Sequence, residues 1–268
     1  MNINHCPASI KNDAISYFGK IYDIKHIKYD LMRDINVKDF LSSLFDAKYW
    51  FYIITNYTID SKLIEITDEE ANALIYSEKI SDRLKNIISE CLINEYFFVK
   101  SSKKSSHSRK KCLTLCDVID ELTYPDVKIT FKIGCRHIFM RKWIDNISSE
   151  YRIYIYANKI RYIEKYIQSK TKLYSKEEEI KYAKEVITFC NEFKNNLEYD
   201  DFIVDIAKIN NVSKYIVIEI NTPMYLYGGL QLGNYDWDHE KIHTTNEIIF
   251  RYEVFTEIGK IINEVIIK

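Results

Sequence analysis

Two compact apolar runs near residue 210 give the clearest strand pattern in the chain. Residues 201–209 (DFIVDIAKI) and 214–221 (KYIVIEIN) are separated by the turn-like NNVS, which predicts an antiparallel pair of strands. Upstream, residues 151–167 (YRIYIYANKIRYIEKYI) are rich in Tyr and Ile and are interrupted at Ala157-Asn158, which predicts a second hairpin. Much of the second half of the chain is therefore expected to be β-sheet.

Shorter apolar runs predict further strands at 49–55, 95–100 and 137–144. After the second of these, residues 101–111 (SSKKSSHSRKK) contain no apolar side chain and six Lys or Arg counting Lys100 at the entry, which predicts a basic loop. A second loop is predicted further on by Gly228, Gly229 and Gly233.

One segment has a strong helical pattern. In residues 175–197, Ser175 is followed three residues later by Glu178, which forms a capping-box signature, and apolar residues then recur at helical spacing. Weaker stripes predict four more helices, at 37–46, 68–91, 113–122 and from about residue 245. Helices and antiparallel strands in this mixture predict an α+β fold.

Composition and charge narrow the class of protein. The chain has 268 residues, of which 47% are apolar, with only 6 Gly and 3 Pro, so a folded protein is expected. Because 38 basic residues face 39 acidic ones, no overall field favours a nucleic acid or an anionic membrane as partner. There is no signal-peptide pattern or long apolar stretch, and the six cysteines are scattered, which predicts a cytoplasmic protein with reduced thiols.

Oxygen-bearing side chains interrupt the apolar strands near residue 210. Side chains alternate across a strand, so Glu219 and Asn221 project to one face. In the expected hairpin, Asp205 lies across from them. A buried carboxylate needs a partner, and three oxygen donors are suited to Mg²⁺, which favours oxygen ligands. The alternative is a solvent-exposed sheet face on which these acids pair with lysines.

The order of the remaining motifs favours the magnesium site over the solvent-exposed sheet face. Lys100 ends the strand FVK, and the Ser/Lys-rich loop with SSHSRK follows it. Two further motifs come next, FMRKW at 139–143 and EYRIYIYANKIRYIEK at 150–165. The acid-bearing strands FIVDIAK and IVIEINTP come last. A phosphate loop first and metal-binding strands last is the order of an ATP-grasp domain. From about Tyr96 to Trp237 the sequence resembles the D123 (cell division cycle 123-like) family of the ATP-grasp superfamily.

The resemblance implies roles for individual residues. Lys100 corresponds to a phosphate-contacting position, and the Ser/Lys-rich loop with Ser105 and Ser106 is expected to wrap the phosphates. Arg152 is placed near the γ-phosphate or the acceptor. Lys165 stands near the nucleotide where the family tends to have glutamine, so its role is open. The adenine-side hinge is implied for Met140, Arg141, Lys142 and Trp143, and Mg²⁺ ligation for Asp205, Glu219 and Asn221.

The sequence also departs from the family pattern. The basic loop is about three residues longer, EIN replaces DFN, and no N-terminal family segment is found before residue 95, so the chain is read as a divergent member. Other features are weaker: Cys112 and Cys116 have no second pair for a zinc site. The basic loop has no aromatic residues for base stacking, and His239 and His243 are more typical of a surface loop and helix start than of a metal site.

The expected fold is an α+β ATP-grasp fold in which two subdomains with antiparallel sheets hold the nucleotide. The expected divisions are an N-terminal subdomain at 1–94, a central one at 95–145 and a C-terminal one at 146–268. The implied ligands are ATP and Mg²⁺. The resemblance favours an ATP-dependent assembly factor that binds a translation initiation factor 2 subunit. The alternatives are an ATP-grasp ligase that joins a carboxylate to a nucleophile through an acyl phosphate, and an Mg-ATP-binding effector without chemistry.

Overall fold

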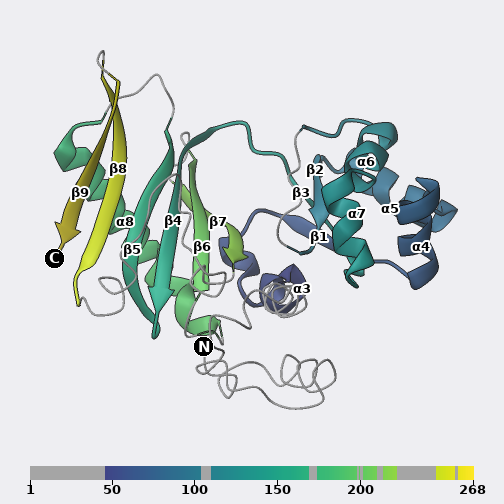
Figure 1. Cartoon of the computed structure of the whole chain (residues 1–268), viewed down its shortest axis with the longest axis horizontal. Helices are drawn as coiled ribbons and strands as arrows, with labels where there is room; N and C mark the ends of the chain where they lie inside the picture. Colours follow the sequence, from purple (N-terminus) through teal and green to yellow (C-terminus); the bar gives the residue numbers. More distant parts are fainter. Residues whose placement is uncertain are drawn as a thin grey trace, which may run out of the picture. The chain divides into compact units, whose positions relative to one another are not determined.

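A computed structural model describes residues 46–103, 110–168, 174–197, 199, 202–209, 214–221, 246–256 and 259–268. The described residues fall into two compact units, which are considered separately (Figure 1). One unit spans Phe45–Asp145, and the other holds the described residues from Asn146 onward. The expected helix at 37–46 and the expected glycine loop lie outside the described residues, apart from Asp46.

The unit from Asn146 onward is built on a six-stranded sheet with the order β7-β6-β4-β5-β8-β9. Neighbouring strands are antiparallel except β5 and β8, which are parallel. The strands are β4 (Ile147–Tyr156), β5 (Lys159–Gln168), β6 (Phe202–Ile209), β7 (Lys214–Asn221), β8 (Ile248–Thr256) and β9 (Gly259–Ile267).

Both expected hairpins of this sheet are confirmed. Strands β4 and β5 are joined by Ala157 and Asn158, whose φ angles of 49° and 57° are those of a tight hairpin turn. Strands β6 and β7 form the second antiparallel pair, with Asp205 directly across from Glu219. The acid-bearing positions are therefore brought together as the sequence predicted.

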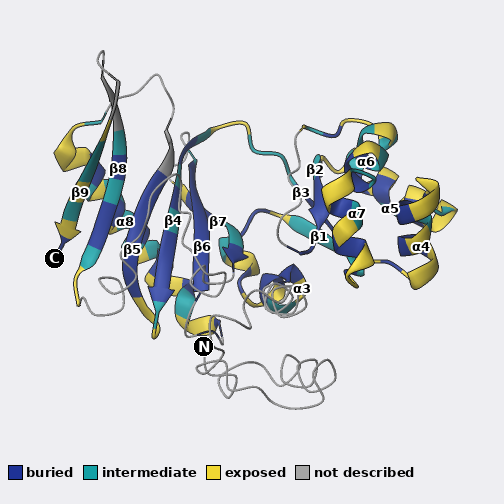
Figure 2. Cartoon of the chain, in the orientation of Figure 1, coloured by how far each residue is buried: buried dark blue, intermediate teal, exposed yellow. Residues whose placement is uncertain are grey.

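Helix α8 (Lys176–Phe193) covers one face of this sheet. Its expected capping box is present, because the Ser175 hydroxyl accepts a hydrogen bond from the backbone N–H of Glu178 and the Glu178 carboxylate accepts one from that of Ser175. The buried stripe includes Ala183, Val186 and Cys190 at helical spacing. Figure 2 shows β4 and β6 buried along most of their length and α8 with an exposed outer side.

The expected helix from about residue 245 is wrong, because this segment forms the antiparallel pair β8 and β9. Phe250 and Tyr252 are buried, while Arg251 between them and Glu253 after them are partly exposed, which is the period of two that defines a strand. The β-branched and aromatic content of the segment favours the same conformation.

The unit spanning Phe45–Asp145 contains a three-stranded antiparallel sheet with the order β1-β3-β2. Its strands are β1 (Ser61–Glu65), β2 (Phe98–Ser101) and β3 (His137–Arg141). Helices α5 (Asp82–Ile93), α6 (Leu115–Leu122) and α7 (Pro125–Lys132) contribute to the core behind one face of the sheet. This unit joins residues of the expected N-terminal and central subdomains, because β1 pairs with β3.

The expected strand at 49–55 is wrong. The segment forms α3 (Ala47–Trp50) followed by the 3₁₀ turns η4 (Phe51–Ile53) and η5 (Thr55–Tyr57). The Asp46 carboxylate caps α3 by accepting from the backbone N–H of Lys48 at 3.0 Å. The buried residues follow the helical spacing i, i+3, i+4, i+7, and they are Ala47, Trp50, Phe51 and Ile54.

The expected single helix at 68–91 is interrupted. It begins as α4 (Asp68–Asn72) and continues as a π-helical turn, η6 (Ala73–Ser77). It ends at Glu78, whose φ of 54° is left-handed. A new helix, α5, then begins with Ser81 as its cap. Helix α6 is confirmed, and the strand expected at 137–144 ends at Arg141.

Glu70 ties α4 to the start of α5. Its carboxylate accepts hydrogen bonds from Arg83 Nε at 3.0 Å, from Arg83 Nη2 at 2.6 Å and from the Ser81 hydroxyl. The Arg83 contact is the main reason why the pKa of Glu70 falls from 4.5 to about 2. Since the folded pKa lies below the unfolded one, this group stabilises the fold above about pH 4.5 and loses that contribution as the pH falls towards 2.

Glu70→Gln is therefore expected to lower the free energy of unfolding at pH 6 and to flatten its fall between about pH 4.5 and 2. The measurement is urea denaturation at a series of pH values. Glu69→Gln, which changes the exposed neighbouring glutamate, serves as the control and should follow the wild type. A parallel pH dependence of Glu70→Gln and wild type would contradict the assignment.

Candidate functional site

Asp205 is the central acid of the candidate metal site. It lies on β6, and its side chain is only 5% exposed. Its Oδ2 accepts a hydrogen bond from Asn221 Nδ2 on β7 at 2.9 Å. Glu219 lies directly across from Asp205 in the register and is partly buried. The structure thus brings the three expected metal-binding residues to one face and one end of the β6–β7 hairpin.

Arg152 joins the same cluster from β4. It lies directly across from Asp205, on the side opposite to Glu219. Its guanidinium donates from Nε to Asp205 Oδ1 at 2.7 Å and from Nη2 to Asp205 Oδ2 at 2.9 Å. This two-point geometry is the strong form of an arginine–carboxylate pair. Strand pairing therefore gives Asp205 two protein partners, one on each neighbouring strand.

The oxygen donors of this cluster fit a hard divalent cation. The Asn221 side chain is fully buried, and its Oδ1 has no hydrogen-bond partner among the described residues, although a buried carbonyl oxygen normally has one. The Asn221 Nδ2 contacts Asp205, Glu219 lies two residues before Asn221 on β7, and Mg²⁺ prefers oxygen ligands. No cluster of three or more His, Cys, Asp or Glu is found among the described residues, so the amide oxygen of Asn221 is needed to complete the set.

Lys165 lies on the other face of the sheet. Its neighbour Glu164 shares a face with Arg152, so alternation along β5 turns Lys165 towards α8. There Lys165 Nζ forms an ion pair with Glu179 Oε1 at 2.6 Å, and the two side chains are 1% and 2% exposed. Burial lowers the pKa of Lys165 and raises that of Glu179, while their mutual contact acts in the opposite direction. The structure does not bring Lys165 together with Asp205.

The other unit holds the remaining expected residues. Lys100, on β2, is largely buried and lies across from Phe139 of β3. Arg141, two residues further along β3, stacks its guanidinium over the Phe139 ring at 4.5 Å from the centroid. Ser101, the next residue of β2, lies across from Ile138 and so points to the opposite face, which packs in the hydrophobic core. The Lys100 face of this small sheet therefore places two cationic groups next to an aromatic ring.

The expected hinge residues differ in their surroundings. Met140 is fully buried in the hydrophobic core of the small sheet, so its side chain faces the helices rather than Lys100. Lys142 lies beyond the end of β3, where its Nζ is 3.8 Å from an Asp60 oxygen. The Trp143 indole donates to Asp145 Oδ1 at 2.7 Å. Of these residues, only Arg141 shares a face with Lys100.

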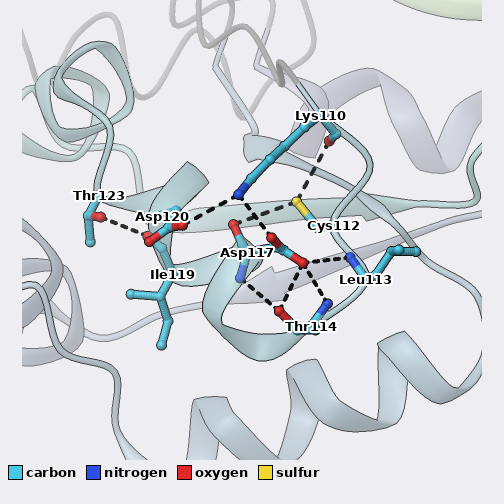
Figure 3. Close-up of polar contacts among 8 residues, drawn as sticks. All are labelled: Lys110, Cys112, Leu113, Thr114, Asp117, Ile119, Asp120 and Thr123. Carbon is cyan, nitrogen blue, oxygen red and sulfur yellow. Dashed lines mark hydrogen bonds and ion pairs between the residues drawn. The ribbon is translucent and has the colours of Figure 1, made fainter.

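The end of the basic loop is held to helix α6 (Figure 3). Lys110 Nζ lies 2.9 Å from Asp117 Oδ1 and 3.4 Å from Asp120 Oδ2. Asp117 also accepts from the backbone and hydroxyl groups of Thr114 as part of the capping box, and the Lys110 contact is the main reason why its pKa is lowered. Ser105 and Ser106 lie outside the described residues.

Sequence reasoning missed two residues of the Arg152 face. Glu164 on β5 lies directly across from Arg152, and Arg251 on β8 lies across from Glu164. Glu164 sits at an alternating position in a recognised strand and was available as a signal. Arg251 was not, because its segment was predicted to be a helix.

Comparison with solved structures shows which fold this is. Cdc123 from Schizosaccharomyces pombe aligns with 69% of this chain and 85% of its own at 14% identity, with a TM-score of 0.53. A C-terminally truncated form gives 13% identity, the same 69% of this chain, 84% of its own and a TM-score of 0.52. The chain has the fold of Cdc123. The expected α+β fold is thus confirmed, and the D123 resemblance holds at the level of the fold.

Other comparisons add less. D-alanine–D-alanine ligase from Bacillus anthracis, complexed with ATP, aligns at 17% identity over 68% of this chain and 57% of its own, but its TM-score of 0.41 is too low to support an argument. No protein-family model and no curated protein matches the sequence. Among the described residues, no helix is long and apolar enough to cross a membrane.

Proposed function

We propose that this chain binds Mg-ATP and acts as an ATP-dependent protein-assembly factor of the translation initiation factor 2 chaperone type, in the cytoplasm. The observation that carries the nucleotide part is the cluster of Asp205, Glu219 and Asn221 at one end of the β6–β7 hairpin. The Cdc123-like fold supports the assembly role, because the order of the sequence motifs resembles the same D123 family. A subunit of initiation factor 2 is the proposed protein partner.

The residues have distinct proposed tasks. Asp205, Glu219 and the Asn221 amide oxygen would hold Mg²⁺, which would neutralise charge on the ATP phosphates. Lys100, Ser105 and Ser106 would contact phosphate oxygens, and Arg152 would stabilise the terminal phosphate. Residues 140–143 would lie at the adenine side, with Arg141 the member whose position on the Lys100 face best suits a contact. Lys165 pairs with Glu179 on the α8 face, so it would not contact the nucleotide and would support the site only by stabilising the sheet.

Calorimetric titration with ATP in the presence of Mg²⁺ tests the nucleotide part. The wild type is expected to bind, and the double variant Asp205→Asn with Glu219→Gln is expected to lose binding because both carboxylates are replaced at constant volume. Glu177→Gln, an exposed acid on α8, is the control and should bind as the wild type does. Equal affinity of the double variant and the wild type would refute the metal assignment.

A second experiment separates the assembly role from a ligase. ATP-dependent capture of an initiation factor 2 subunit by the purified protein, without sustained ADP release, is the expected result. Steady ADP release that requires an added carboxylate and amine, together with a ligated product detected by mass spectrometry, would instead identify an ATP-grasp ligase. Nucleotide binding without capture or turnover would leave an Mg-ATP-binding effector.

A further inference from the structure

Both oxygens of the Asp205 carboxylate already accept hydrogen bonds from protein groups. Arg152 donates to both of its oxygens, at 2.7 and 2.9 Å, and Asn221 Nδ2 donates to Oδ2. A guanidinium held in this way takes one lone pair on each oxygen and competes there with a cation. The 5% exposure of Asp205 makes the pairing important, because a buried carboxylate without a partner is costly.

Arg152 stands between two carboxylates. Asp205 on β6 lies directly across from it on one side, and Glu164 on β5 lies directly across on the other. Direct partners in neighbouring strands project to the same face, so Arg152 can reach either acid by rotating its side chain. Glu164, which is also buried, lies directly across from Arg251 of the next strand, β8.

The charges of this row are unevenly placed. Across the sheet, one register row runs from β7 to β9 and contains Glu219, Asp205, Arg152, Glu164, Arg251 and Glu264. Acid and base alternate everywhere except at the first two positions, where Glu219 and Asp205 are adjacent carboxylates. Like charges directly opposite one another are unfavourable. Asn221, whose buried Oδ1 has no hydrogen-bond partner among the described residues, lies two residues after Glu219 on β7.

We propose that Arg152 is the internal counter-ion of this site: it holds Asp205 while no divalent cation is bound, and it competes with the cation for that carboxylate. This inference rests on the proposed metal ligands. A cation that binds Asp205 displaces the guanidinium, which then turns to Glu164 or to an anionic group of a ligand such as a phosphate. Cation and phosphate-bearing ligand therefore bind cooperatively, and the cation alone binds weakly.

The experiment uses the full chain with Mn²⁺ as the cation probe and no nucleotide. Arg152→Gln removes the competing charge and leaves Asp205 available. Its Mn²⁺ affinity, measured by calorimetry or by electron paramagnetic resonance of the free ion, is expected to be about tenfold tighter than that of the wild type. Its melting temperature is expected to fall in metal-free buffer and to recover with Mn²⁺ by more than the wild type gains.

Two further variants keep the test specific. Arg152→Gln with Asp205→Asn should show no such recovery, because the carboxylate that the cation would take is absent. Arg136→Gln makes the same chemical change in the other unit, where Arg136 pairs with the exposed Asp68, and its Mn²⁺ response should match that of the wild type.

Unchanged or weaker Mn²⁺ binding by Arg152→Gln, or the absence of Mn²⁺ binding by either protein, would overturn the inference, because a purely structural ion pair loses stability without gaining cation affinity. The proposed function is judged separately. If the wild type binds Mg-ATP and the Asp205/Glu219 double variant does not, while Arg152→Gln gains no Mn²⁺ affinity, only the counter-ion role fails.

Discussion

Glu179→Ala is expected to lower the free energy of unfolding by about 3–5 kcal/mol, because it leaves a buried lysine without its partner. Lys165 and Glu179 join β5 to α8 through a contact of 2.6 Å, with both side chains almost fully buried. The Tyr174 ring, 4.5 Å from Lys165 Nζ, offers only a weaker interaction. Urea denaturation followed by circular dichroism at pH 7 measures the effect.

Two comparisons show whether burial is the cause. The double variant Lys165→Met with Glu179→Leu removes both charges at similar volume and is expected to cost much less than the single change. Lys181→Ala removes one member of the Lys181–Glu185 pair on the same helix, where the lysine is well exposed, and is expected to cost less than about 1 kcal/mol. If Glu179→Ala cost no more than the double variant, the two charges would not depend on each other.

Trp50→Ala is expected to destabilise the unit that contains it by about 3–5 kcal/mol. The Trp50 indole is buried, and its ring centroid lies 6.4 Å from that of Phe139 in an edge-on arrangement. Phe51 also packs against the Phe139 ring, with 5.3 Å between the two ring centroids. The loss is expected because the cavity left by the indole adds to the lost transfer free energy. Urea denaturation is again the measurement.

Tyr52→Ala is the matched control, because Tyr52 is an aromatic residue two positions after Trp50 and is 64% exposed. It is expected to change the free energy of unfolding by less than about 0.5 kcal/mol. The pair also distinguishes a helix from a strand. In a strand, Trp50 and Tyr52 would share one face and respond alike. Similar losses for the two variants would contradict the helical assignment of this segment.

The strands near residue 210 could be predicted because local signals agreed with one another. Apolar runs of the right length, a polar turn between them and alternation at Glu219 and Asn221 all indicated one hairpin. The segment at 49–55 was misread because its aromatic residues favour strands on average, whereas Asp46 and the spacing of Ala47, Trp50 and Ile54 specify a helix. Capping and spacing outweighed composition there.

The candidate site was predictable only in part. Asp205, Glu219 and Asn221 come from one hairpin, so their meeting follows from local pairing. The contact between Arg152 and Asp205 depends on β4 lying beside β6, and strand order within a sheet is not encoded locally. Lys165 and Arg152 lie on opposite faces because Glu164, the neighbour of Lys165 on β5, pairs with Arg152. The sequence did not show that α8 covers the Lys165 face, so this separation could not be predicted.

The one parallel pairing of the large sheet sets the order in which the protein can be assembled. Strand β5 lies between β4 and β8, yet β8 follows only after α8, β6 and β7 have been synthesised. Until β8 leaves the ribosome, β5 is the open edge of a four-stranded sheet, with backbone groups ready to pair with another chain. Long-range closure of this kind is slow. Aggregation of the nascent chain is therefore favoured until the β8–β9 hairpin is made.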